Sequence, residues 1–252
     1  MEKEFKIGIV LGGGGTRGFA HLGVLEALFE RGIRPDIISS VSSGSLVGVL
    51  LADGKTPQEI FGFLKAKKMM DFSSIHFPIN GLLSLDGLKK DLQKHLSVNF
   101  LEDLKIPMVV GATNLNTGQP RYFERGEIGD IILASSSIPV LFSPIEIEGY
   151  LYSDGGIYDN LPVTPIRDRC EKIIAINVSP VQETMDLSNL IKIAARVFQL
   201  SVNSNIHKTK AKCDIFIEPE GMDKYDILDS SHAEELFTKG YDFAKRIEIK
   251  ID

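Results

Sequence analysis

The chain has 252 residues, of which 43% are hydrophobic and 25% charged, and its formal net charge is −6. This composition is typical of a globular protein and excludes a repetitive or disordered chain. No dense block of lysine and arginine is present, which excludes the concentrated basic face that nucleic acid binding needs. A small basic group at Lys65, Lys67 and Lys68 is interpreted as a solvated helix face, with contact to anionic lipid as the alternative.

The sequence shows no pattern of a signal peptide or of a membrane-spanning segment. Residues 1–5 contain two acids and no basic leader, and no stretch reaches the ~18 apolar residues of a membrane span. The expected location is therefore cytoplasmic, with at most a transient, peripheral contact with a membrane surface. Cys170 and Cys213 lack neighbouring metal ligands and are expected to be free thiols in or near the core. No metal and no other cofactor is predicted.

The first fifty residues contain two strand–turn–helix units. Residues 5–11 have the pattern of a buried strand, and after a run of glycines the apolar residues of 19–28 repeat at helical spacing. A second strand is predicted over residues 37–41, and a second helix follows it and ends near Gly54. Such units are typical of a parallel sheet.

The middle of the chain, from about Thr56 to Leu104, is less regular. Periodicity predicts one helix around residues 60–64 and another around 88–96. Between them lies a loop with large apolar side chains, namely Phe72, Phe77, Leu82 and Leu83. We interpret this loop as a cap over a lipid site, with core filler beneath the sheet as an equal alternative.

The second half alternates strands and helices again. Strands are predicted over residues 106–112, 145–152, 173–178 and 215–217, and a turn at Thr117-Gly118 leads to residues 121–124. Helical spacing recurs over 190–198 and 233–244. Because no Pro/Ser-rich linker divides the chain, the prediction is one domain over residues 1–252. Its expected fold is a three-layer α/β/α arrangement around a central, mostly parallel sheet.

A glycine-rich turn, Gly12-Gly13-Gly14-Gly15-Thr16-Arg17-Gly18, lies between the first strand and the first helix. The unpaired amides of a helix start favour a negative charge, either a bound phosphate or an oxyanion that forms during catalysis. Gly13, Gly15 and Gly18 fit the dinucleotide spacing G-x-G-x-x-G, with Asp36 as the candidate ribose ligand. A phosphate P-loop is excluded because no Gly-Lys-Ser/Thr follows.

Ser42 lies where the second strand gives way to its helix, in the sequence Ser40-Val41-Ser42-Ser43-Gly44. A nucleophile elbow has this context, and its neighbours two positions away must be small. Gly44 meets that demand fully, whereas Ser40 stands where the usual pattern has glycine. The alternative is a serine-rich helix start used for capping.

Ser153-Asp154-Gly155-Gly156 follows the apolar run of residues 145–152. An acid beside two glycines is by itself most often a turn. Beside the other two motifs, Asp154 is expected to do more than form a turn.

Together these motifs resemble the patatin-like phospholipase family. The resemblance covers about residues 5 to 180 and includes Ala134-Ser135-Ser136-Ser137-Ile138-Pro139 and Asp159-Asn160-Leu161-Pro162-Val163. It implies a Ser-Asp dyad of Ser42 and Asp154, with an oxyanion hole around Gly13, Gly14 and Gly15. The supporting motif residues are Arg17, Gly18, Gly44, Gly155 and Gly156. The later helices are expected to complete the fold.

The function predicted from these residues is hydrolysis of acyl esters of lipids through an acyl-Ser42 ester, of the phospholipase A, lysophospholipase or esterase type. The expected partner is a lipid or another acyl ester. No motif surrounds any of the five histidines, and His21 is expected to be a packed or capping residue. Two alternatives stay open: a nucleotide-binding oxidoreductase, and a lipid-binding relative whose activity is weakened by Ser40.

Overall fold

The computed structural model describes residues 3–67, 85–181, 183, 187–204 and 206–250. One eight-stranded mixed sheet forms its centre, with the order β5-β6-β3-β2-β1-β7-β8 and β4 paired to β3. The apolar loop predicted as a cap, with Phe72, Phe77, Leu82 and Leu83, lies outside the described residues. So do Lys68 and His76.

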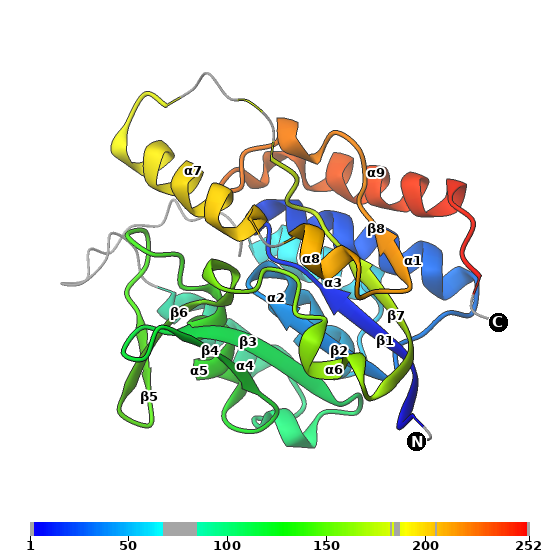
Figure 1. The fold of residues 1–252 in the computed structure, drawn as a ribbon, viewed down its shortest axis with the longest axis horizontal. Helices are drawn as coiled ribbons and strands as arrows, with labels where there is room; N and C mark the ends of the chain where they lie inside the picture. The colour runs from blue at the N-terminus through cyan, green and yellow to red at the C-terminus, as the bar shows by residue number, and fades with distance from the viewer. Residues whose placement is uncertain (1–2, 68–84, 182, 184–186, 205, 251–252) are drawn as a thin grey trace.

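Five neighbouring strands run parallel and carry the early motifs at their ends. They are β3 (Met108–Asn114), β2 (Ile37–Val41), β1 (Phe5–Leu11), β7 (Cys170–Ile176) and β8 (Ile215–Ile217). Figure 1 shows β1 running from the N-terminus into the sheet, with helices on both sides. The prediction of a mostly parallel sheet covered by helices is confirmed.

The edge strands are antiparallel, and one prediction is wrong there. Residues 145–152 form a hairpin of β5 (Ile145–Ile147) and β6 (Tyr150–Asp154) in place of a single strand. Glu148 and Gly149 both have positive φ, 53° and 79°, as a tight hairpin turn requires. The Glu-Gly pair interrupts the apolar run and reverses the chain.

The sheet is buried on both faces. Successive apolar side chains along each strand point alternately to one face and to the other. Ile9 and Leu11 of β1 belong to the larger cluster, which includes α1 (Phe19–Glu30), α2 (Ser43–Ala52) and α9 (Ala233–Arg246). Val10 points the other way, into a smaller cluster with residues 161–166. Two apolar faces explain why these strands read as continuous hydrophobic runs.

The remaining helices surround the sheet, and they include helices that the sequence did not predict. They are α3 (Pro57–Lys67), α4 (Asp86–His95), α5 (Ile128–Ser136), α6 (Thr164–Arg167), α7 (Leu190–Asn203) and α8 (Ile206–Lys210). Helix α5 was not predicted, because its apolar run Ile131–Ala134 is too short for a periodicity test. Within the described parts of the chain, no helix is long and apolar enough to cross a membrane.

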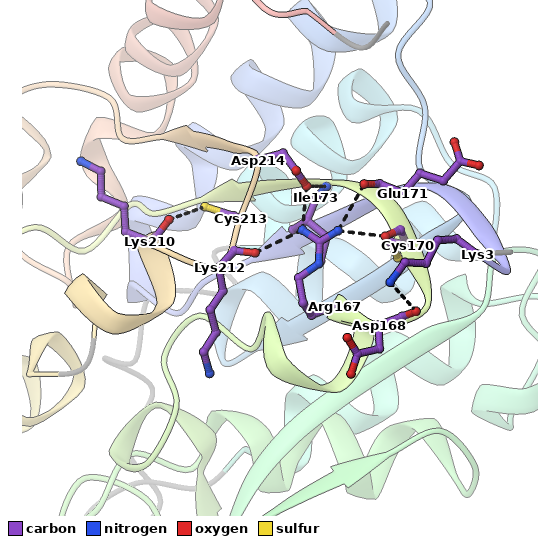
Figure 2. A network of polar contacts seen from close by, with 10 residues as sticks. All are labelled: Lys3, Arg167, Asp168, Cys170, Glu171, Ile173, Lys210, Lys212, Cys213 and Asp214. Carbon is purple, nitrogen blue, oxygen red and sulfur yellow. Dashed lines mark hydrogen bonds and ion pairs between the residues drawn. The ribbon is translucent and has the colours of Figure 1, made fainter. Parts of the chain in front are cut away.

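A polar network holds the start of β7 to the segment that precedes β8 (Figure 2). Arg167 donates to the carbonyl oxygens of Cys170 and Lys212 and pairs with Asp214 at 2.7 Å. Asp214 also accepts the amide of Ile173 at 2.7 Å. Both cysteines are free thiols, as expected, with Cys170 buried and Cys213 half-buried. This network lies at the amino ends of the strands, away from the motifs.

Helices α1 and α9 pack so closely that only glycine fits at two crossing points. A methyl group on Gly23 would overlap the carbonyl oxygen of Phe237, and one on Gly240 would overlap that of Ala20. Gly240→Ala should therefore force the helices apart and lower the free energy of unfolding by about 1–3 kcal/mol. Urea denaturation followed by circular dichroism measures this change.

The matched control is Gly62→Ala in α3, where a methyl group would meet nothing within 4 Å. Alanine has the higher helix propensity, so this change should raise the free energy of unfolding by about 0.5–1 kcal/mol. If both variants shifted the urea midpoint in the same direction, close α1–α9 packing would not be the cause.

Candidate active site

Ser42 occupies a strained turn between β2 and α2. Its φ of 53° and ψ of −130° are rare for a residue with a side chain, and its exposed fraction is only 5%. A methyl group on Gly44 would overlap the carbonyl oxygens of Leu11 and Gly12, so glycine lets α2 begin against the end of β1. This is the geometry of a nucleophile elbow.

The sheet brings Asp154 to Ser42 through their shared neighbour β3. Val41 of β2 is paired with Gly111, and Asp154 of β6 is paired with the next residue, Ala112. Because β4 (Gln119–Phe123) pairs with β3 at residues 110–114, β2 and β6 both lie on the opposite edge. They therefore meet end to end, and the residue after β2 faces the last residue of β6.

The two side chains are in direct contact and nearly shielded from water. Ser42 Oγ donates to Asp154 Oδ2 at 2.7 Å, and the amide of Gly156 donates to Asp154 Oδ1 at 2.8 Å. Asp154 is fully buried, and burial raises its pKa from an ordinary 3.8 to about 7, although both hydrogen bonds act to lower it. A carboxyl with this pKa exchanges protons readily near neutral pH.

A chain of buried serine hydroxyls supports the elbow from below. Ser40 Oγ donates to Ser45 Oγ at 3.2 Å, and Ser45 Oγ lies 3.0 Å from Ser135 Oγ. Ser135 donates to Gly111 O at 2.7 Å, so Ser45 must be the donor between these two, and Ser135 also accepts the Ser42 amide at 2.9 Å. Ser40 thus fills the place of the usual glycine without leaving an unpaired hydroxyl.

The glycine turn lies against Ser42, but its amides are not equivalent. The Gly13 amide donates to Asn160 O at 3.3 Å, and a methyl group on Gly13 would come within 2.9 Å of Ser42 Cβ. Within the described residues, the amides of Gly14 and Gly15 have no hydrogen-bond partner. Of the three glycines predicted to bind an oxyanion, Gly14 and Gly15 therefore have free donors, and Gly13 holds the turn in place.

Arg17 and Thr16 tie the same turn to a segment near the C-terminus. The Arg17 guanidinium is buried and donates to the carbonyl oxygens of Pro180, Asp223 and Tyr225. Its burial lowers its pKa to about 10. Thr16 bonds with its amide and hydroxyl to the carbonyl oxygens of residues 226–227. No local pattern in residues 222–228 predicts this contact.

Asn160 links the glycine turn to the segment around Asp154. Its Nδ2 donates to Gly13 O at 3.3 Å. A methyl group on Gly156 would come within 2.8 Å of Asn160 Oδ1. A methyl group on Gly155 would overlap Gly111 O and the side chain of Val41. The predicted motif residues Gly155 and Gly156 thus allow β6 to end against β3. Gly18, the last motif residue, ends the 3-10 turn η1 (Gly15–Gly18) that precedes α1.

No histidine among those with described side chains contacts Ser42 or Asp154 through a hydrogen bond. His21 is fully buried, its Nε2 lies 2.8 Å from Gly12 O, and burial lowers its pKa to about 4. Because a carbonyl oxygen only accepts, Nε2 carries the proton of a neutral ring. His95 bonds to Asp91 O, and His232 lies beside Glu235. The side chain of His207 lies outside the described residues.

The position of Asp36 excludes the interpretation of the glycine turn as a dinucleotide site. This carboxylate accepts the amides of Lys6 and Ile7 at 3.0 and 2.8 Å, which places it at the start of β1 and β2. The glycine turn lies at the other end of β1, so Asp36 cannot reach a ribose bound there. Across the described residues, no cluster of three His, Cys, Asp or Glu side chains has a metal-binding arrangement.

Comparison with known proteins finds similar sequences over most of the chain. A sequence model of patatin-like phospholipase matches residues 9–166. Lysophospholipase NTE1 of Candida glabrata is 28% identical over 95% of this chain, and that of Saccharomyces cerevisiae is likewise 28% identical over 95%. The chain spans only 16% of the length of these two relatives.

A solved structure gives the fold independently. The crystal structure of VipD from Legionella pneumophila matches with a TM-score of 0.57 at 17% sequence identity. The match covers 96% of this chain and 66% of that one. At this identity the likeness concerns the fold alone.

Ser135 should prove to be a positioning residue for the elbow. Ser135→Ala removes the acceptor of the Ser42 amide and the donor to Gly111 O, which should cost about 1–3 kcal/mol of stability. We also expect kcat for a soluble ester to fall by about tenfold or more while KM changes little, because Ser135 is fully buried and acts through Ser42.

The control is Ser137→Ala, which removes only a hydroxyl that donates to Leu133 O in the same segment. Both hydroxyls are equally buried. If Ser135→Ala and Ser137→Ala have the same kcat, Ser135 does not position the elbow.

Proposed function

This chain belongs to the patatin-like phospholipase family, and from that premise we propose that it hydrolyses acyl esters of lipids with Ser42 as nucleophile and Asp154 as base. The observation that carries this proposal is the 2.7 Å hydrogen bond from Ser42 Oγ to a buried carboxylate. The named relatives are lysophospholipases, so a lipid with a single acyl chain is the substrate that we propose first.

In the proposed reaction the Asp154 carboxylate takes the proton of Ser42 as Oγ attacks the acyl carbonyl carbon. The carbonyl oxygen becomes an oxyanion, and the amides of Gly14 and Gly15 are the donors that we assign to it. Protonated Asp154 then gives its proton to the departing alkoxide. A water molecule, activated by the same carboxylate, hydrolyses the acyl-Ser42 ester and restores the free hydroxyl.

The environment of Asp154 suits both halves of this cycle. A free carboxyl group is a weak base, but burial raises the pKa of Asp154 to about 7. The raised pKa strengthens the base without a histidine and still leaves an acid that can protonate an alkoxide. The neutral His21 supports the same view, since its proton is committed to Gly12 O.

Two other functions are less well supported. The oxidoreductase alternative loses its ribose ligand, because Asp36 lies at the far end of the sheet. The weakened lipid-binding alternative rested on Ser40, whose buried hydroxyl is satisfied by Ser45 and leaves the strained turn at Ser42 in place. A panel of lysophospholipids, phospholipids and simple esters distinguishes the remaining hydrolase types.

Ser42→Ala should reduce ester hydrolysis by about 10⁴-fold or more while the fold is retained, since it removes the nucleophile. A fluorophosphonate should label the parent protein at Ser42, as located by mass spectrometry of peptides. Label on Ser40, Ser43 or Ser45 would assign the nucleophile to a different residue.

Asp154→Asn should abolish turnover and yet stabilise the protein above neutral pH. The folded protein holds the Asp154 proton up to about pH 7, whereas the unfolded chain releases it near 3.8. The stabilising contribution of this group is thus complete below its unfolded pKa and is lost as pH rises toward 7. The asparagine variant has no such loss, so its Tm at pH 8 should exceed that of the parent by roughly 5 °C.

Measurements at low pH provide the control. Near pH 4 the parent Asp154 is already protonated in the fold, so the two Tm values should converge. The acidic limb of kcat/KM in the parent should have an apparent pKa close to 7. A Tm gain of the same size at both pH values would mean that carboxylate desolvation is not its cause.

A further inference from the structure

Helix α7 carries a row of exposed apolar side chains. Leu190, Ile193, Val197 and Leu200 are 72%, 43%, 61% and 50% exposed. Their spacings of three and four residues place them within an arc of about 80° on one side of the helix, at 100° per residue. We call these four residues the α7 stripe. Isolated apolar residues are common on protein surfaces, but a continuous row of them marks an interaction site.

The opposite side of α7 is packed beside the candidate active site. Ala195 and Val202 are buried, and a methyl group on Gly156 would come within 2.9 Å of the Val202 side chain. Phe198 packs against an apolar cluster that includes Ile138. Figure 1 shows α7 on the side toward which β1 runs, away from both chain termini. The stripe therefore faces outward on the helix whose other side contacts the turn that follows Asp154.

The charges of α7 are all positive. Lys192 and Arg196 are its charged residues, and it contains no acid, although the whole chain has a net charge of −6. Both line a cavity of about 270 Å³ that Arg17 of the glycine turn also lines, together with the acids Glu183, Asp223 and Asp226 from segments outside α7. By helical spacing they lie between the α7 stripe and this cavity. An apolar stripe flanked by cations is the pattern of a helix that lies in the surface of a membrane.

We propose that the α7 stripe docks on an anionic lipid surface and holds the candidate active site against it. This inference builds on the proposed function, because a lipid hydrolase must reach esters that are packed in an aggregate. A second copy of the chain fits the stripe less well. A symmetric α7–α7 contact would bring the cations of both helices together, which repels.

The test measures binding to vesicles made of equal amounts of phosphatidylcholine and phosphatidylglycerol. Ser42→Ala is the parent protein in this assay, so that hydrolysis does not alter the vesicles during sedimentation. Adding Val197→Ser and Leu200→Ser should weaken binding by about tenfold or more, since two side chains lose their transfer into the acyl region. Hydrolysis of a soluble short-chain ester by Val197→Ser/Leu200→Ser with Ser42 intact should be unchanged.

Phe100→Ser is the matched control, because Phe100 is 47% exposed but precedes the start of β3, at the opposite end of the sheet. Its vesicle binding should equal that of the parent. The docking proposal is wrong if the parent does not bind vesicles, or if the Phe100 variant loses as much binding as the stripe variant. It is also wrong if light scattering shows a parent dimer that the stripe variant converts to a monomer.

The same experiments separate docking from catalysis. Stripe-dependent binding of vesicles by a chain that hydrolyses no ester would retain the docking surface and reject the proposed function. If the chain hydrolyses esters but its stripe variant binds vesicles as tightly as the parent, the proposed function stands and the docking surface is rejected.

Discussion

The edge of β3 that receives both β2 and β6 is the constraint on which the candidate site depends. A parallel strand and an antiparallel strand end there against adjacent residues, Gly111 and Ala112, so Ser42 and Asp154 face each other across the gap. Their hydrogen bond needs no flexible loop to form it. Ser135 strengthens the same junction, because it binds the Ser42 amide and Gly111 O at once.

Burial of Asp154 raises its pKa, which suits it to act as a base, and it also makes the charged form unfavourable in the fold. Among the described residues, the carboxylate accepts hydrogen bonds from the Ser42 hydroxyl and the Gly156 amide, and both act to lower its pKa. Desolvation therefore dominates and raises the pKa to about 7. A group with this pKa is useful as a base near neutral pH, while its charged form destabilises the fold. Such conflicts between stability and activity are common at functional sites.

Residues beyond the family match complete the site. The matched region ends at residue 166, yet the glycine turn is held by the backbone of residues 223–227 through Arg17 and Thr16. Helix α9 follows this segment and packs on α1, which begins directly after the turn. Helix α7 contacts the turn that follows Asp154. The C-terminal third thus positions the amides and supplies the outward apolar surface beside them.

The sequence by itself determined the features that leave a local trace. Two-faced apolar runs predicted the parallel strands, and the glycines around Ser42 and Asp154 marked the places where backbones nearly touch. Tertiary structure alone decided the joining of β2 and β6 on β3, the partner of the Ser42 amide and the partners of Arg17. Ser135 is 93 residues from Ser42, and Tyr225 is 208 residues from Arg17. Contacts at such separations depend on how the whole chain packs, so no spacing within one segment encodes them.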